Sequence, residues 1–228
     1  MAGAFYLITI IAGVFAEVVV RGSVLVPGDA AATAANILAN ESLYRMGLAA
    51  DLVMLASYIV VTVLLFVLFE PVSRILSMTA AFFSLIGIAV LAVNALNHLA
   101  PLVLLGGATY LGAFETSELQ ALALTCLRMH SRAYGMSAVF FGVYCIAIGV
   151  LAWQSRLLPR VIGVIMAIGG ASYLTSSFVS ILAPALATRL PDVTIIGGIA
   201  ELSFCLWLLV MSVDAAKWTA ERAEGGIP

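Results

Sequence analysis

The chain has 228 residues, of which 64% are hydrophobic and 10% are charged. Soluble domains carry about 25% charged residues, so this composition excludes an ordinary soluble protein. We expect one membrane-embedded domain over residues 1–228, with membrane lipids as its partners and a homo-oligomer left open. The formal net charge of −2 argues against nucleic-acid binding.

Six apolar runs in the chain are candidates for membrane-spanning helices. They are Ala4–Val20, Leu48–Phe69, Ser77–Leu105, Met136–Trp153, Leu158–Ala183 and Val193–Val213. A helix needs about 20 apolar residues to cross the hydrocarbon core, and the first run is near the short limit. A barrel would need alternating segments of about ten residues, which the sequence lacks. The sequence therefore predicts an all-α bundle of six transmembrane helices.

The first span leads into a long connection that contains a second kind of helix. Its apolar run continues into Glu17 and Arg21 rather than a small-residue cleavage site, which indicates a retained span and not a signal peptide. Pro27 and Gly28 then predict a turn, and Asp29 can cap the short alanine-rich helix that follows. We expect this helix to lie on the extracytoplasmic surface.

The segment from Ser117 to Gln154 reads as one helix that begins in water and ends across the membrane. Ser117 and Gln120 have the spacing of a capping box, which predicts the start of the helix. His130 and Tyr134 lie four residues apart, on one face, where the helix enters the apolar run.

Orientation depends on the basic residues of the connections. One side of the predicted topology carries Arg74, Arg156, Arg160, Lys217 and Arg222. The other side carries Arg21, Arg45, Arg128, Arg132 and Arg189, so the counts are equal. Charges in short, compact turns are the better guide, and they predict that both termini are cytoplasmic.

On this topology the intramembrane polar residues of all six helices fall at one depth, towards the outer surface. The group includes Glu17, Arg21, Asp51, Asn94, Asn97, His98, His130, Tyr134, Tyr173, Ser176, Ser177 and Glu201. Ionisable groups in a membrane cost about 2.5–3.5 kcal/mol each on insertion scales and usually face a cavity or a partner. We therefore predict an outward-opening polar pocket, with a Glu17–Arg21 ion pair at one side.

Three long segments carry a resemblance to a known family. They are FAEVVVRGSVLVPGDAAATAANILANESLYRMGLAADLVML, LQALALTCLRMHSRAYGMSAVFFGVYCIAIGVL and LLPRVIGVIMAIGGASYLTSSF. Together they resemble the bacterial membrane-protein family catalogued as domain of unknown function 4386. The resemblance implies a six-helix membrane fold in the bacterial inner membrane, and it implies no activity. Family members often have a second histidine where this chain has Tyr144.

Three classes of function are compatible with these residues. The first is a membrane enzyme acting on a lipid or another amphiphile, with His130, Glu201 and Asp51 as catalytic candidates. Its metal would be zinc or iron, because imidazole and carboxylate ligands suit both. The predicted ligands are His98, His130, Glu17, Asp51 and Glu201, although no HExxH-type motif is present.

The second class binds haem, a quinone or another lipophilic molecule, with cofactor-binding candidates His98, His130 and Tyr134. The chain has two histidines, so one bis-histidine haem is the most it could hold. The third class is a transporter or an accessory subunit. A transporter usually has internal repeats and helices broken at the midplane, and the sequence shows no convincing repeat.

Overall fold

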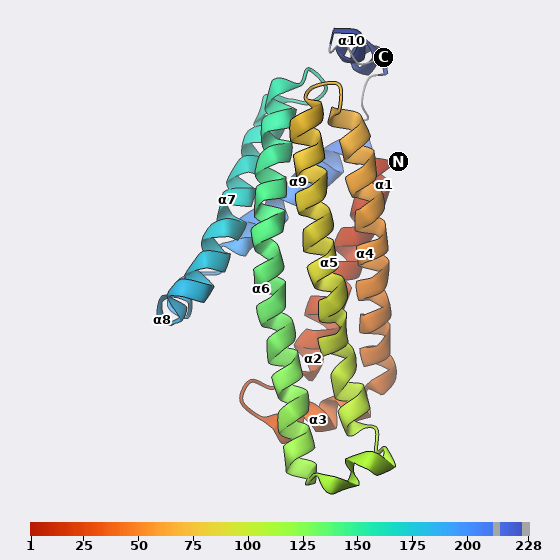
Figure 1. The fold of residues 1–228 in the computed structure, drawn as a ribbon, viewed down its shortest axis with the longest axis vertical. Coiled ribbons are helices and arrows are strands. Elements are labelled where there is room, and N and C mark those ends of the chain that lie inside the picture. Colours follow the sequence, from red (N-terminus) through yellow and green to blue (C-terminus); the bar gives the residue numbers. More distant parts are fainter. Residues whose placement is uncertain (212–214, 225–228) are drawn as a thin grey trace. The chain divides into compact units, whose positions relative to one another are not determined.

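The computed structural model describes residues 1–211 and 215–224, and every regular element in these residues is a helix (Figure 1). The elements are α1 (Ala2–Val14), the π-helix η1 (Phe15–Arg21), α2 (Gly22–Val24), α3 (Ala30–Ala39), α4 (Glu41–Phe69), α5 (Arg74–Leu105), the 3₁₀-helix η2 (Thr109–Ala113), α6 (Thr116–Gln154), α7 (Arg160–Leu182), α8 (Pro184–Ala187), α9 (Thr194–Val210) and α10 (Ala215–Glu224).

Five helical stretches among the described residues are long and apolar enough to cross a membrane. They are Ala2–Val24, Glu41–Phe69, Arg74–Leu105, Thr116–Gln154 and Arg160–Leu182. This result confirms an all-helical, membrane-embedded protein. Helix α9 has 17 residues, at the lower limit for a span. The sixth span therefore stays a prediction, and residues 212 and 213 of its predicted range lie outside the described residues.

The first span is longer than its apolar run and is not a uniform α-helix. Between α1 and α2 the chain forms a seven-residue π-helix, which carries both Glu17 and Arg21. At its end, the backbone N–H of Gly22 donates to the carbonyl of Glu17, five residues earlier. Such π-segments are rare inside α-helices and are frequent at functional sites.

Local capping explains where two of the helices begin. Gly28 has a φ of 83°, which glycine adopts without strain, and Asp29 Oδ1 accepts a hydrogen bond from the Ala32 N–H at the start of α3. The predicted turn and cap are therefore confirmed. Helix α6 begins at Thr116, but its capping pair differs from the prediction, because the Glu118 carboxylate accepts from the Glu115 N–H.

The chain forms two compact units. Unit 1 comprises Met1–Leu7, Ser57–Ala89 and Gly135–Pro228, and unit 2 comprises Ile8–Ala56 and Val90–Tyr134. Helices α4, α5 and α6 contribute residues to both units. Many large apolar side chains are exposed, as expected for helices that face lipid.

Close helix packing shapes unit 1. A Cβ atom added to Gly149 of α6 would lie 2.6 Å from the carbonyl oxygen of Gly163, and the reverse substitution meets the Gly149 carbonyl at the same distance. These glycines therefore allow the backbones of α6 and α7 to touch. Tyr58 stacks on Phe141 elsewhere in this unit, with ring centroids 5.1 Å apart.

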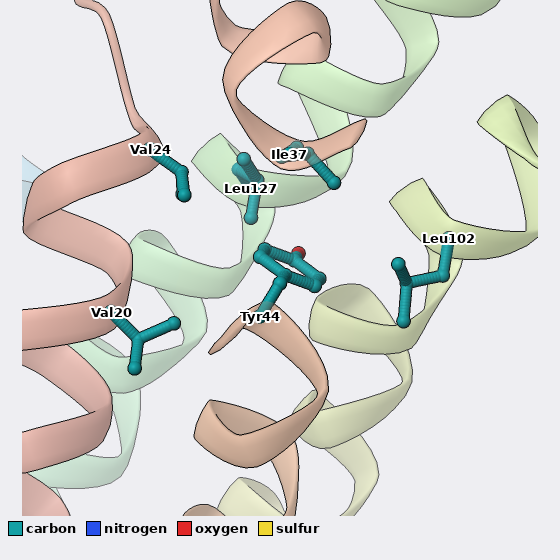
Figure 2. Close-up of a cluster of buried hydrophobic side chains, with 6 residues drawn as sticks. All are labelled: Val20, Val24, Ile37, Tyr44, Leu102 and Leu127. Atoms are coloured by element: carbon teal, nitrogen blue, oxygen red, sulfur yellow. The ribbon is translucent and has the colours of Figure 1, made fainter. Parts of the chain in front are cut away.

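A buried apolar cluster forms the core of unit 2. Its members are Val20, Val24, Ile37, Tyr44, Leu102 and Leu127, and Figure 2 shows them as sticks. Gly47 of α4 lets that helix approach the π-helix, because a Cβ there would lie 2.7 Å from a Val20 methyl carbon. This apolar core adjoins the charged residues described below. Val20 precedes Arg21 in the chain, and Tyr44 contacts His98.

Candidate functional site

A buried guanidinium is the centre of the polar residues in unit 2. Arg21, at the end of the π-helix, is 6% exposed. Its Nε donates to Glu17 Oε2 at 2.8 Å, and its Nη1 donates to Asp51 Oδ2 at 2.7 Å. A second bond joins Nη2 to Asp51 Oδ1 at 3.3 Å. The Glu17–Arg21 pair is thus confirmed, and Arg21 also neutralises a carboxylate from another helix.

Asp51 holds His98 of α5 beside the same guanidinium. His98 Nδ1 lies 2.9 Å from Asp51 Oδ2 and 2.9 Å from Arg21 Nη1. Nδ1 can donate to the Asp51 carboxylate in one neutral tautomer or accept from the Arg21 guanidinium in the other, but it cannot do both. In the first tautomer, Nε2 has the free lone pair. His98 is fully buried, and its Nε2 has no hydrogen-bond partner among the described residues.

Tyr44 fixes the backbone and the ring of His98. Its hydroxyl donates to the His98 carbonyl oxygen at 2.8 Å, and the two rings meet edge to face with centroids 4.5 Å apart. Tyr44 is fully buried and also belongs to the apolar cluster of Figure 2. The imidazole therefore lies against a buried aromatic ring.

His130 of α6 is the second buried imidazole of this unit. Its Nδ1 lies 3.4 Å from the carbonyl oxygen of Asn94, and Asn94 Nδ2 donates to the His130 carbonyl at 3.0 Å. A carbonyl only accepts, so Nδ1 is the donor and Nε2 again has the lone pair. His130 Nε2 is buried without a partner in the described part of the chain. The rings of His98 and His130 have centroids 5.8 Å apart.

Tyr134 lies beside His130, as its spacing of four residues predicts. Their ring centroids are 6.0 Å apart. The Tyr134 hydroxyl donates to the sulfur of Met54 at 3.7 Å. The Tyr134 hydroxyl thus contacts α4, and the imidazole of His130 lies against the carbonyl of Asn94.

A small pocket lies beside the charged residues Glu17 and Arg21. It has a volume of about 110 Å³, and Glu17, Arg21, Leu127 and Ser131 are among its lining residues. This space suffices for several water molecules or one small polar group. Because the Glu17 side chain is 49% exposed and that of Asp51 is 5% exposed, Glu17 is the more accessible of the two carboxylates.

Glu201, the remaining predicted site residue, belongs to unit 1. Its Oε2 accepts hydrogen bonds from Tyr6 at 2.7 Å and Tyr58 at 2.9 Å, and its Oε1 accepts from Tyr173 at 2.7 Å. Three hydroxyl donors from α1, α4 and α7 therefore surround this carboxylate. The structure places it among tyrosines. Among the other predicted residues, Glu17, Asp51 and His98 contact Arg21, and His130 and Tyr134 follow beside His98.

The donor arrangement gives no support to the metal hypothesis. The described residues contain no group of three or more histidine, cysteine, aspartate or glutamate side chains that could hold a metal ion. Arg21 lies between Glu17 and Asp51 and engages both carboxylates. The pocket at Glu17 is also far smaller than the roughly 300–1,000 Å³ of sites for cofactor-sized ligands.

Sequence spacing found some of these contacts and missed others. The i,i+4 rule predicts the Glu17–Arg21 pair, which lies within one helix. It cannot join Arg21 to Asp51, 30 residues away, or Tyr6 to Glu201, 195 residues away. Tyr44 carries no signal in the sequence that distinguishes it from an ordinary interfacial tyrosine.

The apolar helices and the buried charged residues indicate a membrane-embedded helical protein. A model of the family described as "Domain of unknown function (DUF4386)" matches residues 1–212. The chain therefore belongs to this family, as its sequence segments suggest. No significant match was found among curated proteins, and none among solved structures.

Proposed function

We propose that this protein is a membrane enzyme that acts on an amphiphile and uses the Asp51–His98 pair as its proton acceptor. The observation that carries the proposal is the unpartnered Nε2 of His98, whose opposite nitrogen faces Asp51 at 2.9 Å. A carboxylate that orients a histidine in this way also stabilises the imidazolium formed when the histidine takes a proton.

Charged groups of both signs lie beside His98. Asp51 Oδ2 and Arg21 Nη1 each lie 2.9 Å from its Nδ1, and Glu17 is the second carboxylate on the same guanidinium. Glu17 and the small pocket beside it provide the side from which a proton or a polar head group can approach.

The proposed setting is the bacterial inner membrane, with six spans, both termini in the cytoplasm and the polar pocket facing outward. Membrane lipids are the proposed surroundings and the proposed source of substrate. His130 is the proposed second contact for a substrate group, because its buried Nε2 can accept a hydrogen bond.

Turnover of lipid in vesicles tests this function. The purified chain would be reconstituted in vesicles of phosphatidylethanolamine and phosphatidylglycerol, and lipid products followed by mass spectrometry. We expect a product that disappears with His98→Gln and with Asp51→Asn. Glu41→Gln is the matched control on α4, because it removes an exposed carboxylate that pairs with Arg45. Equal product from wild type and His98→Gln would refute the proposal.

A second function, proton-coupled transport, is favoured by the π-helix in the first span. Transporters often place their sites where a membrane helix departs from regular geometry. Glu17 and Arg21 both lie on such a segment. A pH-sensitive dye inside the same vesicles distinguishes the two functions, because proton flux without a lipid product would favour transport.

A further inference from the structure

An apolar groove lies between α6 and α7 in unit 1. It has a volume of about 400 Å³ and is lined by Gly149, Val150, Trp153, Gly163, Val164 and Ala171, among others. The groove follows from the close glycine contact, because residues without side chains leave space beside the touching backbones. Its walls are hydrocarbon and are suited to an extended apolar chain.

A cation contacts Trp153, one of the residues that line this groove. The guanidinium carbon of Arg160 is 5.5 Å from the centre of the Trp153 ring, and both side chains are exposed. Arg160 comes four residues before Val164, so the two residues share one face of α7. The cation–π contact holds the Arg160 side chain in place, which reduces the entropy lost when it binds a ligand.

We propose that this groove binds an acyl chain of an anionic phospholipid of the phosphatidylglycerol type, whose phosphate is held by Arg160. Apolar walls beside one guanidinium match the two parts of such a lipid, since a guanidinium pairs well with phosphate oxygens. Trp153 is the kind of residue that lies at the level of lipid head groups. Basic residues beside grooves between membrane helices commonly bind anionic head groups.

Quenching of Trp153 by brominated lipids tests the proposal. The full chain, with Trp207→Phe and Trp218→Phe so that Trp153 is the remaining tryptophan, would be reconstituted in phosphatidylcholine vesicles. Lipids with brominated acyl chains and either phosphatidylglycerol or phosphatidylcholine head groups would then be added at equal fractions. We expect phosphatidylglycerol to bind about fivefold more tightly, the effect of one basic residue near an anionic lipid.

Two variants separate the head group from the acyl chain. Arg160→Gln should remove the preference for phosphatidylglycerol, whereas Arg189→Gln, which removes another exposed arginine of unit 1, should leave it unchanged. Ala171→Leu should weaken quenching by both lipids, because a larger side chain fills the groove. Equal binding of both lipids to the wild type, a preference that survives Arg160→Gln, or unchanged quenching in Ala171→Leu would each overturn the proposal.

Discussion

Arg21 is the residue whose loss should affect unit 2 most. It contacts two carboxylates and an imidazole while 6% exposed, so its removal leaves Asp51 buried without a cation. Breaking a buried ion pair in this way costs about 3–5 kcal/mol. We therefore expect Arg21→Met to lower the free energy of unfolding by about that amount, measured by thermal or denaturant unfolding in detergent.

Two further variants control for this prediction. The double variant Arg21→Met/Asp51→Leu removes both buried charges and should be more stable than Arg21→Met alone. Arg45→Gln breaks an exposed pair with Glu41 and should change stability by about 0–1 kcal/mol. A double variant no more stable than Arg21→Met would show that the Arg21–Asp51 pair does not determine the loss.

The tyrosines around Glu201 should contribute unequally. Tyr173 donates to Oε1, whereas Tyr6 and Tyr58 both donate to Oε2. Tyr173→Phe removes the hydroxyl from Oε1, and a hydrogen bond to a charged group contributes about 1.5–3 kcal/mol. Tyr58→Phe leaves Tyr6 on the same oxygen and should cost less. Unfolding of both variants in one detergent measures the difference, and an equal loss would contradict this ranking.

At the scale of the helices, the π-helix sets the direction of Arg21. Deletion of Val19 would remove one residue from the segment and favour a regular α-helix, in which Glu17 and Arg21 are three residues apart and still share a face. We expect the deletion to disturb the direction of Arg21 towards Asp51 of α4, and so to lower stability. Val19→Ala is the length-matched control, because Val19 is 48% exposed. A deletion variant as stable as this control would show that the π-geometry is dispensable.

The contact between α6 and α7 gives the next prediction. Gly149→Ala would place a Cβ 2.6 Å from the Gly163 carbonyl oxygen, so the helices must separate. Overpacking of this kind costs about 1–3 kcal/mol. Gly135→Ala on the same helix meets nothing within 4 Å and should be neutral or slightly stabilising. Parallel unfolding measurements compare the two, and an equal response would argue against the glycine contact.

The sequence predicts the helices well because membrane spans need long apolar runs. Helices α4 and α5 begin before the predicted apolar runs. Their N-terminal ends include polar residues such as Glu41 and Arg74. The π-helix has no signal in composition or spacing, since it differs from an α-helix by one residue in hydrogen-bond register. The site was predictable only where its residues share a helix, as Glu17 and Arg21 do.

At the scale of the whole molecule, the charged residues of the two units have different partners. Unit 2 contains Arg21 with its acidic and imidazole partners, and unit 1 contains Glu201 with its tyrosines. The two carboxylate environments differ in kind, because Asp51 has a cation and Glu201 has neutral hydroxyl donors. This difference is one reason why the proposal above uses Asp51 and His98, whereas the contacts of Glu201 connect α1, α4 and α7.

The orientation of the chain in the membrane is the last prediction. The short connections near Arg74 and Arg156 should face the cytoplasm, whereas Ala31 and Thr116 should face the opposite side. Single cysteines at these four exposed positions, in a Cys126→Ser background, would be treated in intact cells with a thiol reagent that does not cross the inner membrane. Labelling at 31 and 116 before lysis, and at 74 and 156 only after it, is expected. The native Cys145 and Cys205 are buried and provide the unlabelled background. Labelling of residue 74 or 156 in intact cells would reverse the orientation and place the Glu17 pocket on the cytoplasmic side.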